Sequence, residues 1–229
     1  MKKKIRKILI ANRGEIAVRI IHACREMGIR SVAIYSTVDR TAMHVRDADE
    51  AYFIGEAPAN ESYLCQDKII QTAVEAGCDA IHPGYGFMAE NAQFASACRI
   101  AGLVFIGPSR ASIQLLGDKI ASRKTMSAVG IPIVPGVDEP DLTDDQLTSA
   151  AEKIGYPVMI KAAGGGGGKG MRAVLSAESF PALVQAARRE AQAAFGNSTV
   201  FLEKFLVKPR HIEFQIFGDQ HGNHIHLLE

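Results

Sequence analysis

The sequence lacks a charge excess of either sign. Its 26 Lys and Arg residues nearly balance 25 Asp and Glu residues, which leaves a formal net charge of +1. Such a balance gives no reason to expect a nucleic-acid or membrane-surface partner. Long apolar runs are missing as well. Residues 8–11 follow a basic start but end at Asn12, too early for a signal peptide, and no stretch could span a bilayer.

Cysteine is scarce and widely spaced, and no C-x-x-C pair occurs. The four cysteines are Cys24, Cys65, Cys78 and Cys98. Cys24 and Cys98 fall in helical patterns, where a buried free thiol is the usual arrangement. This favours a reducing compartment, the cytoplasm, over a secreted disulfide scaffold.

What the chain does have is a run of five glycines at 164–168, followed by Lys169 and Gly170. The flanks, 156–160 and 171–175, are short, apolar and typical of strands. Consecutive glycines suit a backbone that approaches a ligand closely, and the N–H groups of such a loop can hold polyphosphate. A flexible linker would mix in Ser and Thr and would not be bounded by strands. The run therefore predicts a phosphate-binding flap.

The glycine run departs from the commoner phosphate motifs. A Walker A loop fails twice, because Ala163 stands at its first glycine and Gly170 at its final Ser/Thr. A G-x-G-x-x-G match exists at 165–170, but a Rossmann fingerprint must open a helix, and here a strand follows. Strand–glycine loop–strand is the topology of a kinase-type glycine lid.

The first half of the chain alternates strands and helices. Strands are expected at 8–11, 31–35, 51–54, 79–81 and 103–106, and helices at 16–27, 69–76 and 90–101. This alternation predicts a parallel sheet with helices on both faces.

The second half begins with helices at 109–116, 118–129 and 146–154. A small α+β module able to move as a lid follows, with strands at 156–160, 171–175 and 199–204 and a helix at 180–195. Residues 211–216 alternate with period two, which predicts a strand with Ile212, Phe214 and Ile216 directed inward. A last strand is expected at 224–229. Because the chain stops inside this hairpin, we expect it to be the front part of a longer polypeptide.

Five stretches together resemble one family. They are residues 10–17 (IANRGEIA), 82–91 (HPGYGFMAEN), 117–119 (GDK), the glycine run, and 209–213 (PRHIE). They occur in this order in biotin carboxylases, the ATP-grasp subunits or domains of acetyl-CoA, propionyl-CoA and pyruvate carboxylases. The resemblance covers essentially the whole chain.

The resemblance implies an α/β fold in two parts. Residues 1–116 are expected to form a Rossmann-like parallel sheet, the pre-ATP-grasp domain. Residues 117–229 are expected to form an incomplete ATP-grasp domain, with a lid at about 134–204 and the start of the C-terminal ATP-grasp sheet.

The resemblance also implies ATP-dependent carboxylation of biotin on a carrier protein, with bicarbonate and through carboxyphosphate. ATP, Mg²⁺ and carrier-bound biotin are the cofactors and substrates it implies. The implied partners are a biotin carboxyl carrier protein or domain, a carboxyltransferase and a second copy in a homodimer. His22 stands on the dimer-forming helix where the family has a basic residue. An acetyl-CoA acceptor would place the enzyme in fatty acid biosynthesis, but the sequence does not identify the acceptor.

The family's nucleotide-binding residues match positions in this chain. Lys119 and Lys161 are expected to contact the ATP phosphates, and Gly166, Gly167 and Gly168 to close over them, with Met171 near the adenine. The adenine-binding hinge falls on Glu203, Lys204 and Leu206, and His211 faces the nucleotide.

Two loops follow predicted parallel strands, at the edge where ligands usually bind. On one of them, His82 and Tyr85 are candidates for a substrate site, although His82 also suits a turn-adjacent polar group. On the other, Asn12, Arg13 and Glu15 are expected to be structural, with an Arg–Glu pair near a helix N-terminus.

No catalytic or metal-binding residue can be assigned. The family's magnesium-binding glutamates and its bicarbonate- and biotin-binding residues match no position here, so we expect the chain alone to be inactive. His224 and His226 are expected to be surface residues. Two alternatives remain: another ATP-grasp ligase, such as a carbamoyl-phosphate synthetase or an amino-acid ligase, and a non-catalytic nucleotide-binding module.

Overall fold

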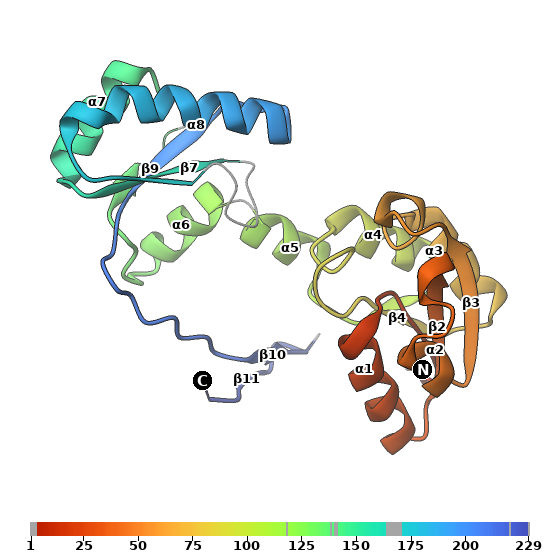
Figure 1. The fold of residues 1–229 in the computed structure, drawn as a ribbon. Coiled ribbons are helices and arrows are strands. Elements are labelled where there is room, and N and C mark those ends of the chain that lie inside the picture. The colour runs from red at the N-terminus through yellow and green to blue at the C-terminus, as the bar shows by residue number, and fades with distance from the viewer. Residues whose placement is uncertain are drawn as a thin grey trace. The chain divides into compact units, whose positions relative to one another are not determined.

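The structure, a computed structural model, describes residues 4–117, 119–137, 139, 142–163, 171–219 and 221–228; the side chains of Lys119 and Ile120 are not described. The chain divides into two units, Met1–Ser122 and Arg123–Glu229 (Figure 1).

The first unit is built on a parallel sheet of five strands in the order β3-β2-β1-β4-β5. The strands are β1 (Lys7–Ile10), β2 (Arg30–Ser36), β3 (Glu50–Gly55), β4 (Ala80–His82) and β5 (Val104–Phe105). Parallel pairing throughout confirms the sheet that the strand–helix alternation predicts.

Helices cover both faces of this sheet, as predicted. They are α1 (Gly14–Glu26), α2 (Met43–Asp47), α3 (Gln66–Glu75), α4 (Ala92–Ile100) and α5 (Arg110–Gly117). Successive β1 side chains point to opposite faces. Ile8 and Ile10 therefore pack with the buried side of α1, while Leu9 packs with α3 and α4 residues such as Ile69 and Phe94.

The strand order reverses at β1. The chain passes from β1 to β2 on one side and returns later to β4 on the other. The loops that follow β1 and β4 consequently leave the sheet side by side, and the Ala11 N–H donates to the His82 carbonyl at 2.9 Å. In open α/β sheets such a reversal is where ligands bind.

The second unit contains a four-stranded antiparallel sheet in the order β6-β9-β7-β8. Its strands are β6 (Gly136–Val137), β7 (Val158–Ala162), β8 (Arg172–Val174) and β9 (Val200–Lys204), preceded in the chain by α6 (Lys119–Ala128). Two helices, α7 (Asp144–Ile154) and α8 (Phe180–Phe195), lie together over one face of the sheet (Figure 1).

We call the sheet β6-β9-β7-β8 the lid sheet, because it falls in the lid expected at about 134–204. Its two faces have different chemistry. On β7, Val158 and Ile160 are fully buried against α7 and α8, where Leu147 and Phe180 complete the core. The residues between them on the strand alternate to the other face. That face carries Lys161 and is only partly buried.

The expectation for residues 211–216 is wrong. A short hairpin of β10 (Ile216–Gly218) and β11 (His224–His226) forms, but the strand begins only at Ile216. Ile212 and Phe214 are 50% and 59% exposed, and Ile216 is exposed as well. Alternating apolar residues turn inward only where another layer covers them, and the described residues supply no such layer.

Several short elements escaped the sequence patterns. They are α2 and the 3-10 turns at Thr37–Asp39, Ala59–Glu61 and Ala177–Ser179. Helices of three to five residues are too short to show a hydrophobic period. Among the described residues, no helix is long and apolar enough to cross a membrane.

Candidate functional site

Lys161 and Glu203 lie next to each other on the partly buried face of the lid sheet. The antiparallel register sets Met159 opposite Glu203 and Lys161 opposite Phe201, so Lys161 and Glu203 are diagonal neighbours on one face. The Lys161 ammonium donates to Glu203 Oε2. The sequence places both residues in the nucleotide site but does not predict this ion pair.

A third charged residue joins them from α6. Arg123 Nη1 lies 3.3 Å from Glu203 Oε1, and Arg123 Nη2 donates to the Val134 carbonyl at 2.8 Å. The side chains of Arg123, Glu203 and Lys161 are 12%, 14% and 24% exposed. We call these three residues the lid charge cluster. Apart from Lys119 at its start, α6 carries no motif residue, so nothing in the sequence singled out Arg123.

The other two residues of the predicted hinge, Lys204 and Leu206, lie outside the lid charge cluster. The Lys204 ammonium donates to the carbonyls of Gly155 and Tyr156, at 2.8 and 3.2 Å, so its side chain ties β9 to the turn after α7. Its backbone N–H donates to Pro135. Leu206, two residues on, is half-exposed. The Lys204 ammonium is therefore engaged within the protein.

Met171 stands where β8 begins and is 43% exposed. Ile160 and Arg172 are the last paired residues of β7 and β8. Continuing this antiparallel register by one residue sets Met171 opposite Lys161, on the same face. The structure thus brings an apolar side chain to the lid charge cluster, as a site for a base beside phosphates requires.

Of the other predicted nucleotide residues, only His211 lies fully within the described part of the chain. Gly166, Gly167 and Gly168 lie outside the described residues, as does the Lys119 side chain. His211 lies in the extended segment after β9, where its Nε2 is 3.0 Å from Glu213 Oε1; both side chains are largely exposed.

A separate polar arrangement occupies the strand-order reversal of the first unit. Asn12 is almost fully buried, and its amide donates to the carbonyls of Pro83 and Tyr85, each at 2.8 Å. Gly84 lies so close that a Cβ there would meet the Asn12 amide nitrogen at 2.8 Å, and its φ is +66°. Asn12 thus fixes the loop after β4 through its backbone.

The two substrate-site candidates on that loop have different surroundings. The His82 Nδ1 accepts from the Gly84 N–H at 3.1 Å, and burial lowers the pKa of this imidazole. His82 is therefore neutral near pH 7 and engaged in the turn. The Tyr85 side chain is 58% exposed and available to a ligand.

The sequence predicts that Arg13 pairs with Glu15, but in the structure Arg13 pairs with Asp39. The guanidinium donates to both carboxylate oxygens, with Nε 2.7 Å from Oδ2. Asp39 also accepts from Tyr63 Oη at 2.7 Å and from Ser36 Oγ at 3.1 Å. Glu15 lies inside α1, whereas Asp39 follows β2 at the same sheet edge as Arg13. We call Arg13, Ser36, Asp39 and Tyr63 the Asp39 cluster.

Titration behaviour follows from this geometry. The hydrogen bond from Arg13 lowers the pKa of Asp39 from 3.8 to about 2. Burial, with the bond to Asp39 second, raises the pKa of Tyr63 from 10.0 to about 12. The Tyr63 ring stacks on Phe87 of the loop after β4 at 5.3 Å. The expected structural role of Arg13 stands, with a different acid.

Among the described residues, no three His, Cys, Asp or Glu side chains converge so that they could hold a metal ion. His224 and His226 are exposed in β11. His22 Nε2 lies 3.9 Å from Asp47 Oδ2 on the surface of the first unit.

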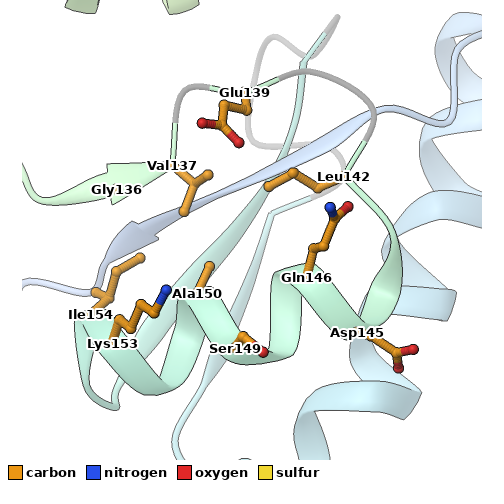
Figure 2. A pocket seen from close by; sticks show the side chains of 10 residues that line it. All are labelled: Gly136, Val137, Glu139, Leu142, Asp145, Gln146, Ser149, Ala150, Lys153 and Ile154. Carbon is orange, nitrogen blue, oxygen red and sulfur yellow. The ribbon is translucent and has the colours of Figure 1, made fainter.

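A hollow of about 540 Å³ lies between β6 and α7, apart from the lid charge cluster. Its lining residues are Gly136, Val137, Glu139, Leu142, Asp145, Gln146, Ser149, Ala150, Lys153 and Ile154. Figure 2 shows Val137 and Leu142 directed into it and Asp145 directed away. It opens widely to solvent, and none of the described site candidates lines it, so it is a gap at the edge of the lid core.

Comparison with known families divides the chain much as the structure does. The family described as "Biotin carboxylase, N-terminal domain" matches residues 4–113. The family described as "Carbamoyl-phosphate synthase L chain, ATP binding domain" matches residues 118–229.

Curated relatives are more than half identical. The biotin carboxylase of Nostoc sp. is 54% identical over 226 residues, which cover 99% of this chain and 51% of the relative. The mitochondrial methylcrotonoyl-CoA carboxylase subunit alpha of Rattus norvegicus is 52% identical over 225 residues, 98% of this chain and 32% of the relative. The chain thus spans about half or less of the length of these proteins.

Solved structures agree with the fold. A biotin carboxylase from Campylobacter jejuni in a β-γ-ATP complex matches with a TM-score of 0.93 and 43% identity, covering 97% of this chain and 50% of that one. The biotin carboxylase domain dimer of Hydrogenobacter thermophilus 2-oxoglutarate carboxylase, with MgADP, ADP and bicarbonate, matches at 0.91 and 47% identity, covering 98% and 49%. The chain therefore belongs to the biotin carboxylase family.

Proposed function

We propose that this chain carries the nucleotide-binding part of an enzyme that uses ATP and bicarbonate to carboxylate biotin on a carrier protein. One observation carries the proposal. Lys161, on the strand that enters the glycine run, places its ammonium on a partly buried sheet face where two cations share one carboxylate. Two cations beside one carboxylate, on a strand that the glycine run follows in the sequence, suit a polyphosphate.

Each residue of the site has a role within this proposal. Lys161 and Lys119 are to contact the phosphates, while Gly166, Gly167 and Gly168 close over them and exclude water. Met171 packs against the adenine, and the backbone of Glu203, Lys204 and Leu206 reads its edge. His211 is to face the nucleotide. Bound ATP supplies the phosphoryl group that activates bicarbonate.

The substrate side of the proposal rests on the loop after β4. Tyr85 is exposed at the strand-order reversal, and its carbonyl is fixed by Asn12. We assign Tyr85 to the substrate site, with neutral His82 shaping the turn. Among the described residues no three possible metal ligands converge, so Mg²⁺ is given no ligand in this proposal.

Further parts of the proposal concern the assembly. The proposed partners are a biotin carboxyl carrier and a carboxyltransferase, and the proposed assembly is a homodimer; these rest on the family. The proposed location is the reducing cytoplasm, which rests on the cysteine pattern. The division into domains 1–116 and 117–229, with a lid at about 134–204, also belongs to it. The first unit of the structure ends at Ser122.

A carbamoyl-phosphate synthetase type of ligase is the alternative, favoured by the name of the family that matches 118–229. The match over 4–113 to the biotin carboxylase N-terminal domain argues for the first proposal. Both share the predicted nucleotide site. ADP formation by an enzyme that contains this chain distinguishes the two proposals. Stimulation by biotin supports the first, and stimulation by ammonia or glutamine supports the alternative.

Calorimetric titration with ADP tests the nucleotide site directly. Replacing Lys161 by Met keeps the aliphatic stem and removes one charge-assisted phosphate contact. The affinity should fall about tenfold to a hundredfold, equivalent to roughly 1.5–3 kcal/mol.

Lys153→Met is the matched control, because Lys153 is an exposed lysine on α7 of the same unit. Its ADP affinity should equal that of the unmodified chain. Equal affinities for the Lys161→Met and Lys153→Met variants would refute the assignment.

A further inference from the structure

The carboxylate of Glu203 is divided between two cations. Oε2 accepts from Lys161, and Oε1 lies 3.3 Å from Arg123 Nη1. Each oxygen thus faces its own positive group, and neither cation blocks the other. Because all three side chains are mostly buried, water compensates these charges only in part.

The guanidinium of Arg123 is fixed independently of Lys161. Its Nη2 donates to the Val134 carbonyl at 2.8 Å, just before β6. The same nitrogen would lie 3.0 Å from a Cβ at Gly136, so it rests against the β6 backbone. In Figure 1, α6 lies on the side of the lid sheet opposite α7 and α8. Arg123 therefore approaches Glu203 from the same side as Lys161.

Lys161 has a contrasting attachment. Its ammonium ends a flexible four-carbon stem and is bound to Glu203. A phosphate that binds the ammonium must compete with this carboxylate. If Glu203 had no other partner, drawing Lys161 away would leave a buried, uncompensated charge, which is strongly unfavourable.

We propose that Arg123 is a positioning residue of the nucleotide site, which holds Glu203 so that the Lys161 ammonium can pass from the carboxylate to a nucleotide phosphate. This inference rests on the proposed function, in which Lys161 contacts phosphate. With Arg123 in place, Glu203 stays compensated before and after the transfer. The three residues together carry a formal charge of +1, which suits a polyphosphate ligand.

Arg123 also joins α6 to β6 through Val134, a role that concerns structure alone. The two roles differ in what they change. Loss of a purely structural contact would change the affinities for adenosine and ADP equally, because both ligands bind to the same lid. Positioning of Lys161 affects only ligands that carry phosphate.

Arg123→Gln is the decisive variant, because an amide can still donate to Val134 while the charge is lost. Calorimetry with ADP, and displacement of ADP by adenosine, give the two affinities. The ADP affinity should fall about tenfold, and the adenosine affinity should stay unchanged. Arg123→Lys keeps the charge and should retain the ADP affinity within about threefold.

The Lys161→Met background separates the possible mechanisms. If Arg123 acts through Lys161, adding Arg123→Gln to the Lys161→Met protein should cause less than a third of the loss of ADP affinity that Arg123→Gln causes in the unmodified chain. The full loss in that background would mean that Arg123 acts on the nucleotide directly and would overturn the positioning role. Equal losses of ADP and adenosine would overturn it in favour of a structural tie.

Failure of the inference and failure of the proposed function give different results. If Lys161→Met leaves ADP affinity intact, the nucleotide site itself is misassigned and the inference falls with it. If Lys161→Met weakens ADP but Arg123→Gln does not, only the inference is wrong. Should Arg123→Gln fail to fold by circular dichroism, Arg123→Lys decides, and a selective loss of ADP in that variant overturns the proposal.

Discussion

Asp39 in the first unit and Glu203 in the second are both mostly buried carboxylates beside an arginine, yet their charges are matched differently. Asp39 meets one guanidinium and two hydroxyl groups, so its cluster is electrically neutral. Glu203 meets two cations, and the three residues of its cluster carry a formal charge of +1. A closed, neutral arrangement stabilises a fold, whereas excess charge in a partly buried place favours a ligand of opposite sign.

The clusters also differ in what surrounds them. The Asp39 cluster joins β2, α1 and the loop after β4 through Tyr63, whose ring stacks on Phe87. The lid charge cluster lies on a sheet face that α7 and α8 leave uncovered. Removing charge should therefore affect the stability of the first unit and the ligand affinity of the second.

The largest expected effect is on stability, from Asp39→Asn. Asn retains the shape but loses the charge that accepts from Arg13, and charge-assisted bonds of this kind contribute about 2–3 kcal/mol. The first unit should be destabilised by that amount. Hydrogen exchange measured by mass spectrometry, peptide by peptide, reports it in β1 and β2.

Asp67→Asn, at an exposed position in the first turn of α3, is the control and should cost less than about 1 kcal/mol. Unchanged exchange in β1 and β2 of the Asp39→Asn protein would contradict the structural role of the cluster.

The next prediction concerns the unfolding free energy at low pH. Because the pKa of Asp39 falls from 3.8 to about 2 on folding, its contribution is fully present above pH 4. The contribution is lost as the pH falls through about 2, and the shift is worth about 2 kcal/mol. The difference in unfolding free energy between wild type and Asp39→Asn should therefore shrink between pH 5 and pH 2.

His44 also titrates in acid, since burial lowers the pKa of its imidazole. The Asp39 carboxylate partly raises this pKa, so the contribution of His44 cancels only in part in the difference. A difference that stays constant down to pH 2 would show that Asp39 is not held by Arg13 in solution.

A smaller effect is expected from Gly136→Ala in the lid. The added Cβ would lie 2.6 Å from the Leu202 carbonyl oxygen and 3.0 Å from Arg123 Nη2, so β6 or Arg123 must shift. The cost in lid stability should be about 1–2 kcal/mol. ADP affinity should fall too, because Arg123 is displaced.

Gly117→Ala is the steric control, since a Cβ there meets nothing within 4 Å. It should leave lid stability unchanged in thermal unfolding followed by circular dichroism. If the two glycine variants melt alike, the close packing of Arg123 against β6 is wrong.

The sequence predicted the parts of the fold that rest on local pattern. Strand–helix alternation was sufficient for the parallel sheet and its two helical faces. Residues 211–216 failed because their alternation describes a strand only if another layer covers Ile212 and Phe214.

The candidate site divides in the same way. Lys161 and Tyr85 are candidates because a motif surrounds them, and Glu203 because it lies in the predicted hinge. Arg123 and Asp39 were missed, since each is selected by a partner 80 or 26 residues away. Asp39 had a weak signal, as an acidic residue just past a parallel strand; Arg123 had none.

Hydrogen exchange with and without ADP, measured on wild type, Asp39→Asn and Lys161→Met, tests the contrast between the two clusters most directly. The account predicts that Asp39→Asn speeds exchange in β1 and β2 but keeps ADP-induced protection of β7 and β9. Lys161→Met should exchange like wild type without ligand and lose that protection. Protection by ADP in Lys161→Met equal to that in wild type would contradict the account.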